Sequence, residues 1–201
     1  MAATMIHLLL AHRLESQADG LYYRGHFAPD AIDLRAGINY EEKGKWHLRN
    51  APNREAALKE LYARIDKNDP FQRGYFSHLF FDWCWDADVI GQFQKASPQD
   101  WFAQYRQENS DAGVWVYKFM PWMGEVVQRF QQARQDFLLP MEEPTKEEIT
   151  HFCDFMFSQE WKEKYIEKAD DELRNKIITP AFLEKYIEEA ADKHERLILC
   201  T

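Results

Sequence analysis

The sequence predicts an all-α fold: a single compact domain of about seven helices. Three observations favour it. Apolar residues recur at the helical spacing of 3.6 through most of the chain, no segment alternates like a β-strand, and Gly and Pro number only 8 each. A chain of 201 residues with 45% hydrophobic content is long enough to bury its own core. We therefore treat residues 1–201 as one helical domain.

The amino-terminal part is predicted to be a short helix followed by a loop. Residues 4–16 have the helical pattern, with Thr4 as N-cap and His7 on the apolar face. Residues 20–52 are interrupted by glycine and proline and are expected to be irregular. Because aromatic residues are frequent in this stretch, we expect the loop to be ordered and functional.

From Asn53 onward the helical pattern returns. Asn53 is expected to cap a helix that ends near Ile65, and residues 70–94 form the next helix. This second helix is apolar almost all round, so it should lie at the centre of the fold. Further helices are predicted over 97–107, over 111–137 with a kink at Pro121, from Thr145 as N-cap, and from Thr179–Pro180 towards the carboxyl end.

Composition excludes several classes of protein. With 25 Lys+Arg against 34 Asp+Glu the net charge is -9, which argues against binding of a nucleic acid duplex or an anionic membrane. No apolar run approaches the 18 residues of a membrane span, and the amino terminus lacks the pattern of a signal peptide. The 3 widely spaced cysteines fit a reducing compartment. We therefore expect a cytoplasmic protein.

The most specific local motif is a histidine and an aspartate one helical turn apart. His78 and Asp82 stand at positions i and i+4 of the predicted central helix, so both side chains share one face. Such a pair can bind one divalent metal ion. The alternative is a pair that only hydrogen-bonds in the core, since a buried carboxylate needs a partner.

Three further residues favour the metal site over the structural pair. His7 is on an apolar face, Asp30 follows a proline among apolar residues, and His47 follows Trp46. Each alone also has a structural explanation, as a core histidine bonded to the backbone or as a turn residue. Together with His78 and Asp82 they supply three imidazoles and two carboxylates, the ligand mixture of a hydrolytic zinc site.

Four segments carry a resemblance to a known family. In order along the chain they are His7, the sequence APDAI at 28–32, Lys45-x-His47, and GYFSHLFFD at 74–82. This series resembles the zinc-dependent phospholipase C family, an all-helical fold that also includes single-strand nucleases. The resemblance covers about residues 5–95 and is closest to the short cytoplasmic bacterial members. Residues 96–201 would then be the helical support of the site.

The resemblance implies a metal centre and an activity. By position, Asp30, His47, His78 and Asp82 would form the core metal site. Asp82 would bridge to a second zinc ion, which His7 would also bind. Two zinc ions, or other divalent metals, would activate a water molecule for attack on a phosphoester. The implied function is a metal-dependent phosphoester hydrolase, and the acidic composition favours a small soluble substrate.

Other residues are open candidates for roles at this site. Arg35 and Arg49 are candidates to bind phosphate oxygens or to form surface ion pairs. His26 is a candidate for an extra ligand or a proton shuttle. His151, with Glu147 one turn before it, is a weaker candidate ligand, whereas His194 is expected to be solvated. Five tryptophans are candidates to line a cleft or to fill the core: Trp83, Trp85, Trp101, Trp115 and Trp122.

The sequence also departs from the family and leaves other functions open. Secreted members complete a third metal with histidines after the central helix, and here residues 83–150 contain none. A metallophosphohydrolase of the HD type is disfavoured because no His-Asp dipeptide occurs. The remaining alternative is a non-catalytic helical interaction protein with a structural or vestigial metal site.

Overall fold

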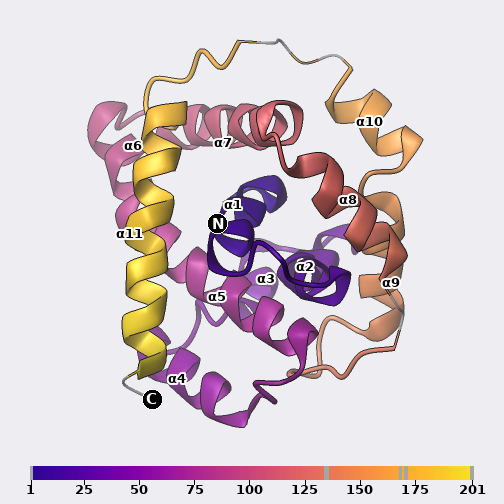
Figure 1. The fold of residues 1–201 in the computed structure, drawn as a ribbon. Coiled ribbons are helices and arrows are strands. Elements are labelled where there is room, and N and C mark those ends of the chain that lie inside the picture. The colour runs from indigo at the N-terminus through magenta and orange to yellow at the C-terminus, as the bar shows by residue number, and fades with distance from the viewer. Residues whose placement is uncertain (1, 134–135, 168, 170–171, 200–201) are drawn as a thin grey trace.

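The computed structural model of the chain describes residues 2–133, 136–167, 169 and 172–199. Within those ranges every regular element is helical, and eleven α-helices and one 3-10 helix follow one another (Figure 1). The all-α prediction is confirmed. The predicted number of about seven helices is wrong, because the expected loop holds three helices, residues 70–94 form two, and the helix over 159–165 is not among those predicted.

The largest difference from the prediction is in residues 20–52. This stretch is not an irregular loop but holds α2 (Gly20–Phe27), the 3-10 helix η1 (Ala28–Leu34) and α3 (Tyr40–Trp46), all after α1 (Thr4–Leu14). Side-chain caps start two of these helices: Asp19 accepts backbone N–H bonds at α2, and Asn39 accepts one at α3. Helices of this length are marginal alone and persist through tertiary packing, which periodicity does not reveal.

The middle of the chain folds largely as predicted. Asn53 caps α4 (Arg54–Arg64), and the aromatic segment forms α5 (Pro70–Asp88), followed by the short α6 (Ile90–Ala96). Asp69 caps α5, with Pro70 at its first position. Helix α5 buries side chains all round and lies in the centre of the fold with α2 and α1, as Figure 1 shows.

Five helices of the second half surround this centre: α7 (Trp101–Phe119), α8 (Met123–Gln132), α9 (Lys146–Phe155), α10 (Gln159–Tyr165) and α11 (Pro180–Leu199). The cap at Thr145 and the helix start at Thr179–Pro180 are confirmed, and Oγ1 of Thr179 also accepts a hydrogen bond from the backbone N–H of Phe182. The predicted boundaries of 97–107 and 111–137 are wrong, since α7 runs without a break to Phe119 and Pro121 separates it from α8. Residues 134–135 of that prediction lie outside the described residues.

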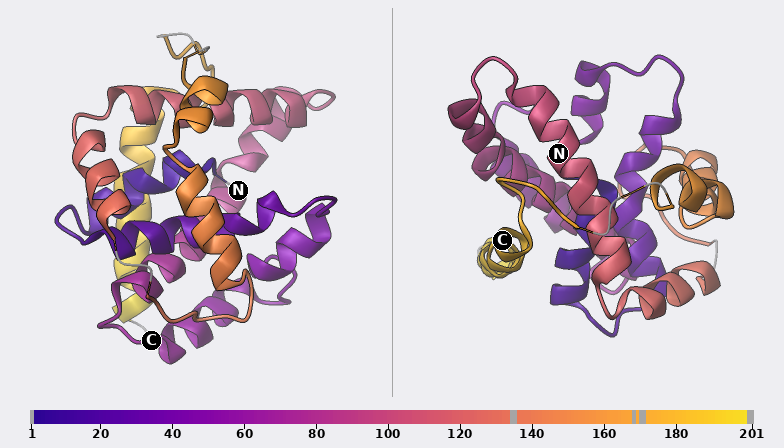
Figure 2. Two further views of the ribbon diagram at one scale, coloured as in Figure 1. Left: turned by 90° about the vertical axis from the view of Figure 1, so that its right-hand side faces the viewer. Right: turned by 90° about the horizontal axis from the view of Figure 1, so that it is seen from above.

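The outer helices enclose the central ones on several sides. Helix α7 crosses one end of the bundle, α11 runs along one flank, and α8 and α9 lie on the opposite flank (Figures 1 and 2). Helices α1 and α5 therefore lie between these layers and bury residues on most of their faces. In the described residues, no helix combines the length and apolarity that crossing a membrane requires.

Candidate metal centre

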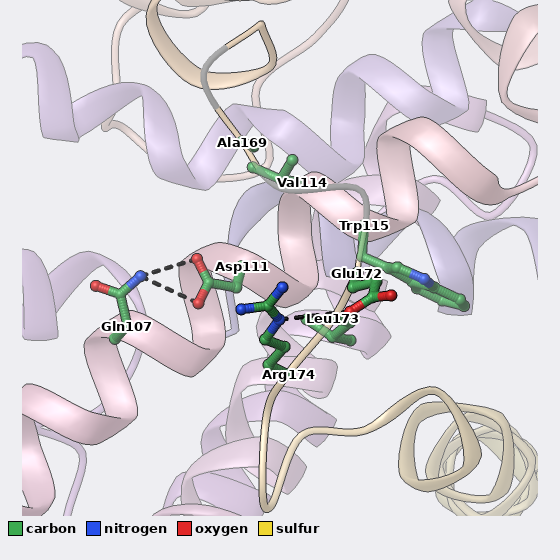
Figure 3. A pocket seen from close by; sticks show the side chains of 8 residues that line it. All are labelled: Gln107, Asp111, Val114, Trp115, Ala169, Glu172, Leu173 and Arg174. Atoms are coloured by element: carbon green, nitrogen blue, oxygen red, sulfur yellow. Dashed lines mark hydrogen bonds and ion pairs between the residues drawn. The ribbon is translucent and has the colours of Figure 1, made fainter.

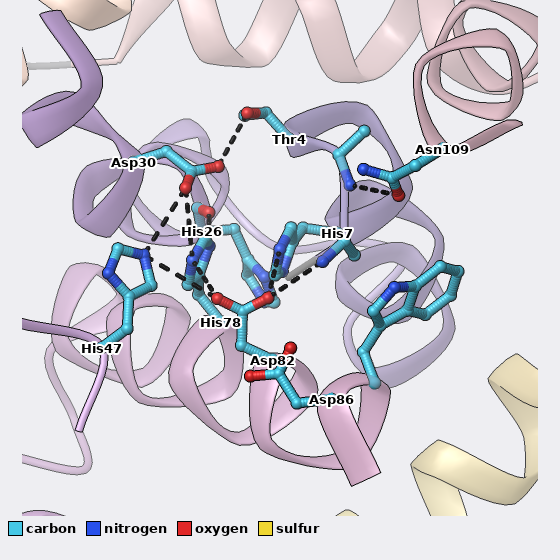
Figure 4. Close-up of polar contacts among 12 residues, drawn as sticks. Thr4, His7, His26, Asp30, His47, His78, Asp82, Asp86 and Asn109 are labelled. Atoms are coloured by element: carbon cyan, nitrogen blue, oxygen red, sulfur yellow. Dashed lines mark hydrogen bonds and ion pairs between the residues drawn. The ribbon is translucent and has the colours of Figure 1, made fainter. Parts of the chain in front are cut away.

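The five predicted ligands come together in the interior. His7 projects from α1, Asp30 from η1, His47 from the end of α3, and His78 and Asp82 from α5 (Figure 4). All are buried, with Asp30 the most exposed at 3%. Two groups of these side chains bring their ligand atoms within 4.8 Å of one another and can hold a metal ion: His7, Asp30 and His78, and His47, His78 and Asp82.

Four of these atoms are spaced like the corners of one coordination site. Nε2 of His47 lies 3.5 Å from Oδ1 of Asp30 and 3.7 Å from Oδ2 of Asp82. Nε2 of His78 lies 3.9 Å and 3.4 Å from the same two oxygens. Tetrahedral ligands with bonds of about 2.0–2.1 Å are about 3.3–3.4 Å apart, so these separations are close to, or slightly wider than, those of a zinc site.

The second oxygen of Asp82 faces a different side. Its Oδ1 lies 3.4 Å from Nε2 of His7 and accepts a hydrogen bond of 3.1 Å from the backbone N–H of Ala2. The rings of His7 and His78 stack with centroids 3.8 Å apart, which fixes both imidazoles beside the carboxylate. Asp82 thus stands between two sets of imidazole nitrogens, as Figure 4 shows.

The inward-facing atoms lack ordinary hydrogen-bond partners. Nε2 of His47, Nε2 of His78, Oδ2 of Asp82 and both ring nitrogens of His7 are buried without a hydrogen bond among the described residues. Buried polar atoms are rarely left unsatisfied, because each loses its hydration. Nε2 of His47, Nε2 of His78 and Oδ2 of Asp82 lie close enough together to fit one cation, which would satisfy these three atoms at once, whereas the two nitrogens of His7 point to different sides of its ring.

Backbone carbonyls orient the two central imidazoles. Nδ1 of His78 lies 2.6 Å from the carbonyl oxygen of His26, and Nδ1 of His47 lies 3.0 Å from that of Lys43. A carbonyl can only accept, so each Nδ1 carries the proton and each Nε2 directs a lone pair into the cluster. This arrangement is usual for histidines that bind metals.

The close approach of α2 and α5 allows the hydrogen bond between Nδ1 of His78 and the carbonyl oxygen of His26. At Gly25 a Cβ atom would lie 2.1 Å from the carbonyl oxygen of Phe71, and at Gly74 it would lie 2.0 Å from that of Tyr22. Only glycine lets α2 and α5 approach to this distance. The backbone of α2 therefore reaches the ring of His78, one turn beyond Gly74.

Asp30 is oriented by two side chains that the sequence analysis did not identify. Oγ1 of Thr4 donates a hydrogen bond of 2.7 Å to Oδ2 of Asp30, and Nζ of Lys43 lies 3.4 Å from Oδ1. The prediction of Thr4 as an N-cap is wrong, because it lies inside α1 and Ala3 takes the cap position. Helical spacing could have indicated that both side chains lie near the site, because Thr4 precedes His7 by three residues and Lys43 precedes His47 by four.

Electrostatics favour the protonation state that a metal ligand needs at Asp30, Asp82 and His7. At His78, by contrast, burial is outweighed by Asp30 and Asp82, which raise the pKa of the imidazole. Burial alone would raise the pKa of Asp30, but Lys43 and His78 lower it well below its usual value. Burial likewise opposes ionisation of Asp82, but the adjacent imidazoles of His7 and His78 lower its pKa well below its usual value. Burial lowers the pKa of His7 to about 4. At neutral pH the site therefore presents two carboxylates and a neutral His7.

The two arginine candidates have different surroundings. Arg49 forms an ion pair of 2.9 Å with Asp86 and lines a pocket that also contains Asp30. Arg35 instead pairs with Glu143 and, at 2.8 Å, with Glu148. Arg35 is therefore part of a carboxylate network between η1 and the start of α9. Arg49 is the arginine of the two that borders the cluster.

The remaining histidines lie outside the two groups. His26 is fully buried, its ring packs against Tyr22, and its backbone carbonyl contacts His78. His151 is exposed, as is Glu147, so the structure does not bring them to the cluster. His194 was expected to be solvated, and this is wrong. It is 9% exposed, with Nε2 3.1 Å from Oγ of Ser77.

Two pockets are informative about access. A pocket of about 670 Å³ opens beside Asp30, with η1 and α3 on one side and α6 and α7 on the other. The pocket in Figure 3 lies elsewhere, between α7 and residues around Leu173. None of the five predicted ligands lines it, and Glu172 and Arg174 there are largely exposed. The pocket beside Asp30 is therefore the candidate route to the cluster.

Comparison with known proteins identifies no relative. No protein-family model, no curated protein and no solved structure matches this chain.

Proposed function

We propose that this protein is a metal-dependent phosphoester hydrolase that binds two zinc ions, or other divalent ions, and acts on a small soluble phosphoester. The observation that carries the proposal is the position of Asp82. Its Oδ2 faces His47 and His78, and its Oδ1 faces His7. A carboxylate with imidazole nitrogens on both sides is suited to bridge two metal ions, the arrangement used by many phosphoester hydrolases.

The residues divide between the two proposed ions. Asp30, His47, His78 and Oδ2 of Asp82 would bind the first, a set of two nitrogens and two oxygens that suits zinc. His7 and Oδ1 of Asp82 would bind the second. The lower number of protein ligands at this second position leaves room for water or substrate.

The chemistry follows from charge and access. Bound divalent ions supply a water nucleophile at neutral pH and neutralise charge on the phosphoryl oxygens. Water would add its oxygen to phosphorus while the bond from phosphorus to the leaving oxygen breaks, and the proton that water loses would be balanced by protonation of the leaving group, giving a phosphate and an alcohol. Asp30 lines the pocket, and Lys43 and Arg49 line it too, so cationic side chains are available to attract and orient an anionic phosphoester.

The series of motifs adds support. The four segments that resemble the zinc-dependent phospholipase C family all contribute to the cluster, from α1, η1, the end of α3 and α5. Membership of that family, and with it the phospholipase C-like fold, is part of the proposal.

The test begins with protein purified without a metal-affinity tag. Metal content is measured by mass spectrometry, and hydrolysis is followed with p-nitrophenyl phosphate and bis(p-nitrophenyl) phosphate. We expect close to two equivalents of metal, hydrolysis that EDTA abolishes, and recovery when zinc is added. Asp82→Asn should lose metal and activity. Asp88→Asn is the matched control, since Asp88 lies on the same helix but pairs with Lys193.

Two outcomes would contradict the proposal. Protein that binds less than one equivalent of metal, even after dialysis against zinc, has no metal centre. Protein that binds metal through Asp82 but hydrolyses neither substrate would instead be a non-catalytic helical protein with a structural metal site.

A further inference from the structure

We propose that the phosphoester bound by this centre has a large aromatic group, which the pocket beside Asp30 receives. This inference rests on the proposed function and specifies its substrate class. It is carried by the pocket itself, whose lining combines charged residues of η1 and α3 with aromatic residues of α7 and which includes one of the predicted metal ligands.

One wall of the pocket is charged. Asp30 and Asp33 from η1, Lys43 from α3 and Arg49 just beyond it line this side. Lys43 pairs with both aspartates, at 3.4 Å from Oδ1 of Asp30 and 2.5 Å from Oδ2 of Asp33. Metal ions beside Asp30 would offset the acidic charge, so this wall would attract the phosphoryl end of a ligand.

The opposite wall is aromatic. Trp101, Phe102 and Tyr105 of α7 line it together with Ile90 of α6, and the polar Arg106 and Asn109 of α7 also border the pocket. The rings of Trp101 and Phe102 meet edge to face at 5.4 Å, and Phe102 is 51% exposed. Phe102 is the exposed ring of the three, with Trp101 half-buried and Tyr105 buried beside it, so together they offer a ligand a supported aromatic surface. Aromatic rings pack against other rings with a geometric preference that aliphatic groups lack.

The aromatic wall is anchored next to the metal centre. Tyr105 is buried, and its hydroxyl accepts a hydrogen bond of 3.1 Å from Nε1 of Trp85 on α5. The charge of Asp82 is among the influences on the pKa of Tyr105, which burial raises. A ligand with its phosphate at Asp30 therefore has a fixed aromatic surface within reach of its organic group.

The size of the pocket also favours an organic group. Its volume of about 670 Å³ lies in the range of pockets for organic ligands, about 300–1,000 Å³. Inorganic phosphate or a methyl ester would contact only the charged wall and leave the rings exposed. An aryl phosphoester contacts both walls at once.

The test uses non-hydrolysable probes, so that binding is measured without turnover. Methylphosphonate, cyclohexylphosphonate and phenylphosphonate are titrated into zinc-loaded protein by calorimetry. We expect phenylphosphonate to bind about tenfold more tightly than methylphosphonate, and more tightly than cyclohexylphosphonate of similar size. Trp101→Ala and Phe102→Ala should each remove most of this preference while methylphosphonate affinity stays within about twofold.

Phe119→Ala is the matched control. Phe119 lies on the same helix, is 42% exposed and does not line the pocket, so its loss should leave the aryl preference unchanged. Equal affinity for phenyl- and methylphosphonate, equal affinity for the phenyl and cyclohexyl probes, or an equal loss in the Phe119 variant would each overturn the inference. If hydrolysis and metal binding persist in that case, the proposed function stands alone. Failure to bind zinc would overturn both.

Discussion

Thr4 and Asp30 are joined by a hydrogen bond of 2.7 Å from the hydroxyl of the first to Oδ2 of the second. This bond connects α1 to η1 and leaves Oδ1 of Asp30 to face His47 and His78. We expect Thr4→Val to weaken zinc binding by about 10- to 100-fold, because a ligand that loses its orienting partner must be ordered by the metal itself. Competition with a chromophoric chelator measures the affinity.

The variant Thr4→Ser distinguishes the contribution of the hydroxyl group to zinc affinity from that of the methyl group. The serine variant retains the donor, so its zinc affinity should stay within about threefold of the parent protein. Equal losses in the valine and serine variants would show that packing of the methyl group matters and that the hydrogen bond does not.

Because the two oxygens of Asp82 face different histidines, we expect two histidine variants to bind different numbers of metal ions. His7 approaches Asp82 at Oδ1 and not at Oδ2, although its ring also stacks on His78, so His7→Gln should lose one equivalent of metal and retain the other. His78 faces both Asp30 and Oδ2 of Asp82, and its ring also stacks on His7. His78→Gln should therefore reduce both occupancies. Mass spectrometry of dialysed protein gives the counts, and identical counts for the two variants would contradict a bridging Asp82.

Replacing Arg49 and replacing Arg35 are expected to have different effects on the KM for a phosphoester. Arg49 lines the pocket, so Arg49→Gln should raise the KM for a phosphoester about tenfold or more through the lost charge-assisted contact. Arg35 does not line the pocket and pairs with Glu143 and Glu148, so Arg35→Gln should leave KM within about twofold. Steady-state kinetics with p-nitrophenyl phosphate checks both, and a larger KM effect in the Arg35 variant would place the phosphate elsewhere.

Local sequence patterns were sufficient for the parts of the site that lie on strongly periodic helices. His78 and Asp82 are one turn apart on α5, and His7 is on the apolar face of α1, so helical phase alone placed them inward. The caps at Asn53 and Thr145 could be predicted for the same reason, because an N-cap acts over three residues.

Features that depend on contacts between distant segments could not be predicted. The elements η1 and α3 are short and persist through tertiary packing, so residues 28–46 resembled a loop. His194 follows Ala190 by four residues on the apolar face of α11, so helical phase could have indicated its burial, but its contact with Ser77 follows only from the docking of α11 against α5. The roles of Gly25 and Gly74 likewise depend on how α2 and α5 pack together.

The contact at Gly74 predicts a large effect of one methyl group. Gly74→Ala should lower the free energy of unfolding by about 3 kcal/mol or more, since the new Cβ would collide with the backbone of α2. It should also weaken zinc binding, because the His26 carbonyl would move away from His78. Urea denaturation measures the first effect. Gly91→Ala is the control: nothing lies within 4 Å of its Cβ position, and we expect a gain of about 0.5–1 kcal/mol. Similar losses in both variants would contradict close packing at Gly74.

His194 predicts part of the acid sensitivity of the metal-free protein. Burial lowers the pKa of His194 from 6.5 to about 4. Between these values the unfolded chain binds a proton at this position and the folded chain does not, so stability falls as the pH drops from 6.5 to 4. At most, one histidine contributes a slope of about 1.4 kcal/mol per pH unit in this window. Above pH 6.5 the contribution is constant, because the side chain is neutral in both states.

His194→Gln removes that titration while retaining a side chain that can hydrogen-bond to Ser77. Urea unfolding of EDTA-treated protein at several pH values between 4 and 7 gives the free energy of unfolding of each form. The variant should have the shallower slope below pH 6.5, whatever its stability at pH 7. His7 is also buried with a pKa of about 4, so it should continue to contribute acid sensitivity in the variant. Parallel curves for parent and variant would show that His194 is protonated equally in the folded and unfolded states, contrary to its burial between α5 and α11.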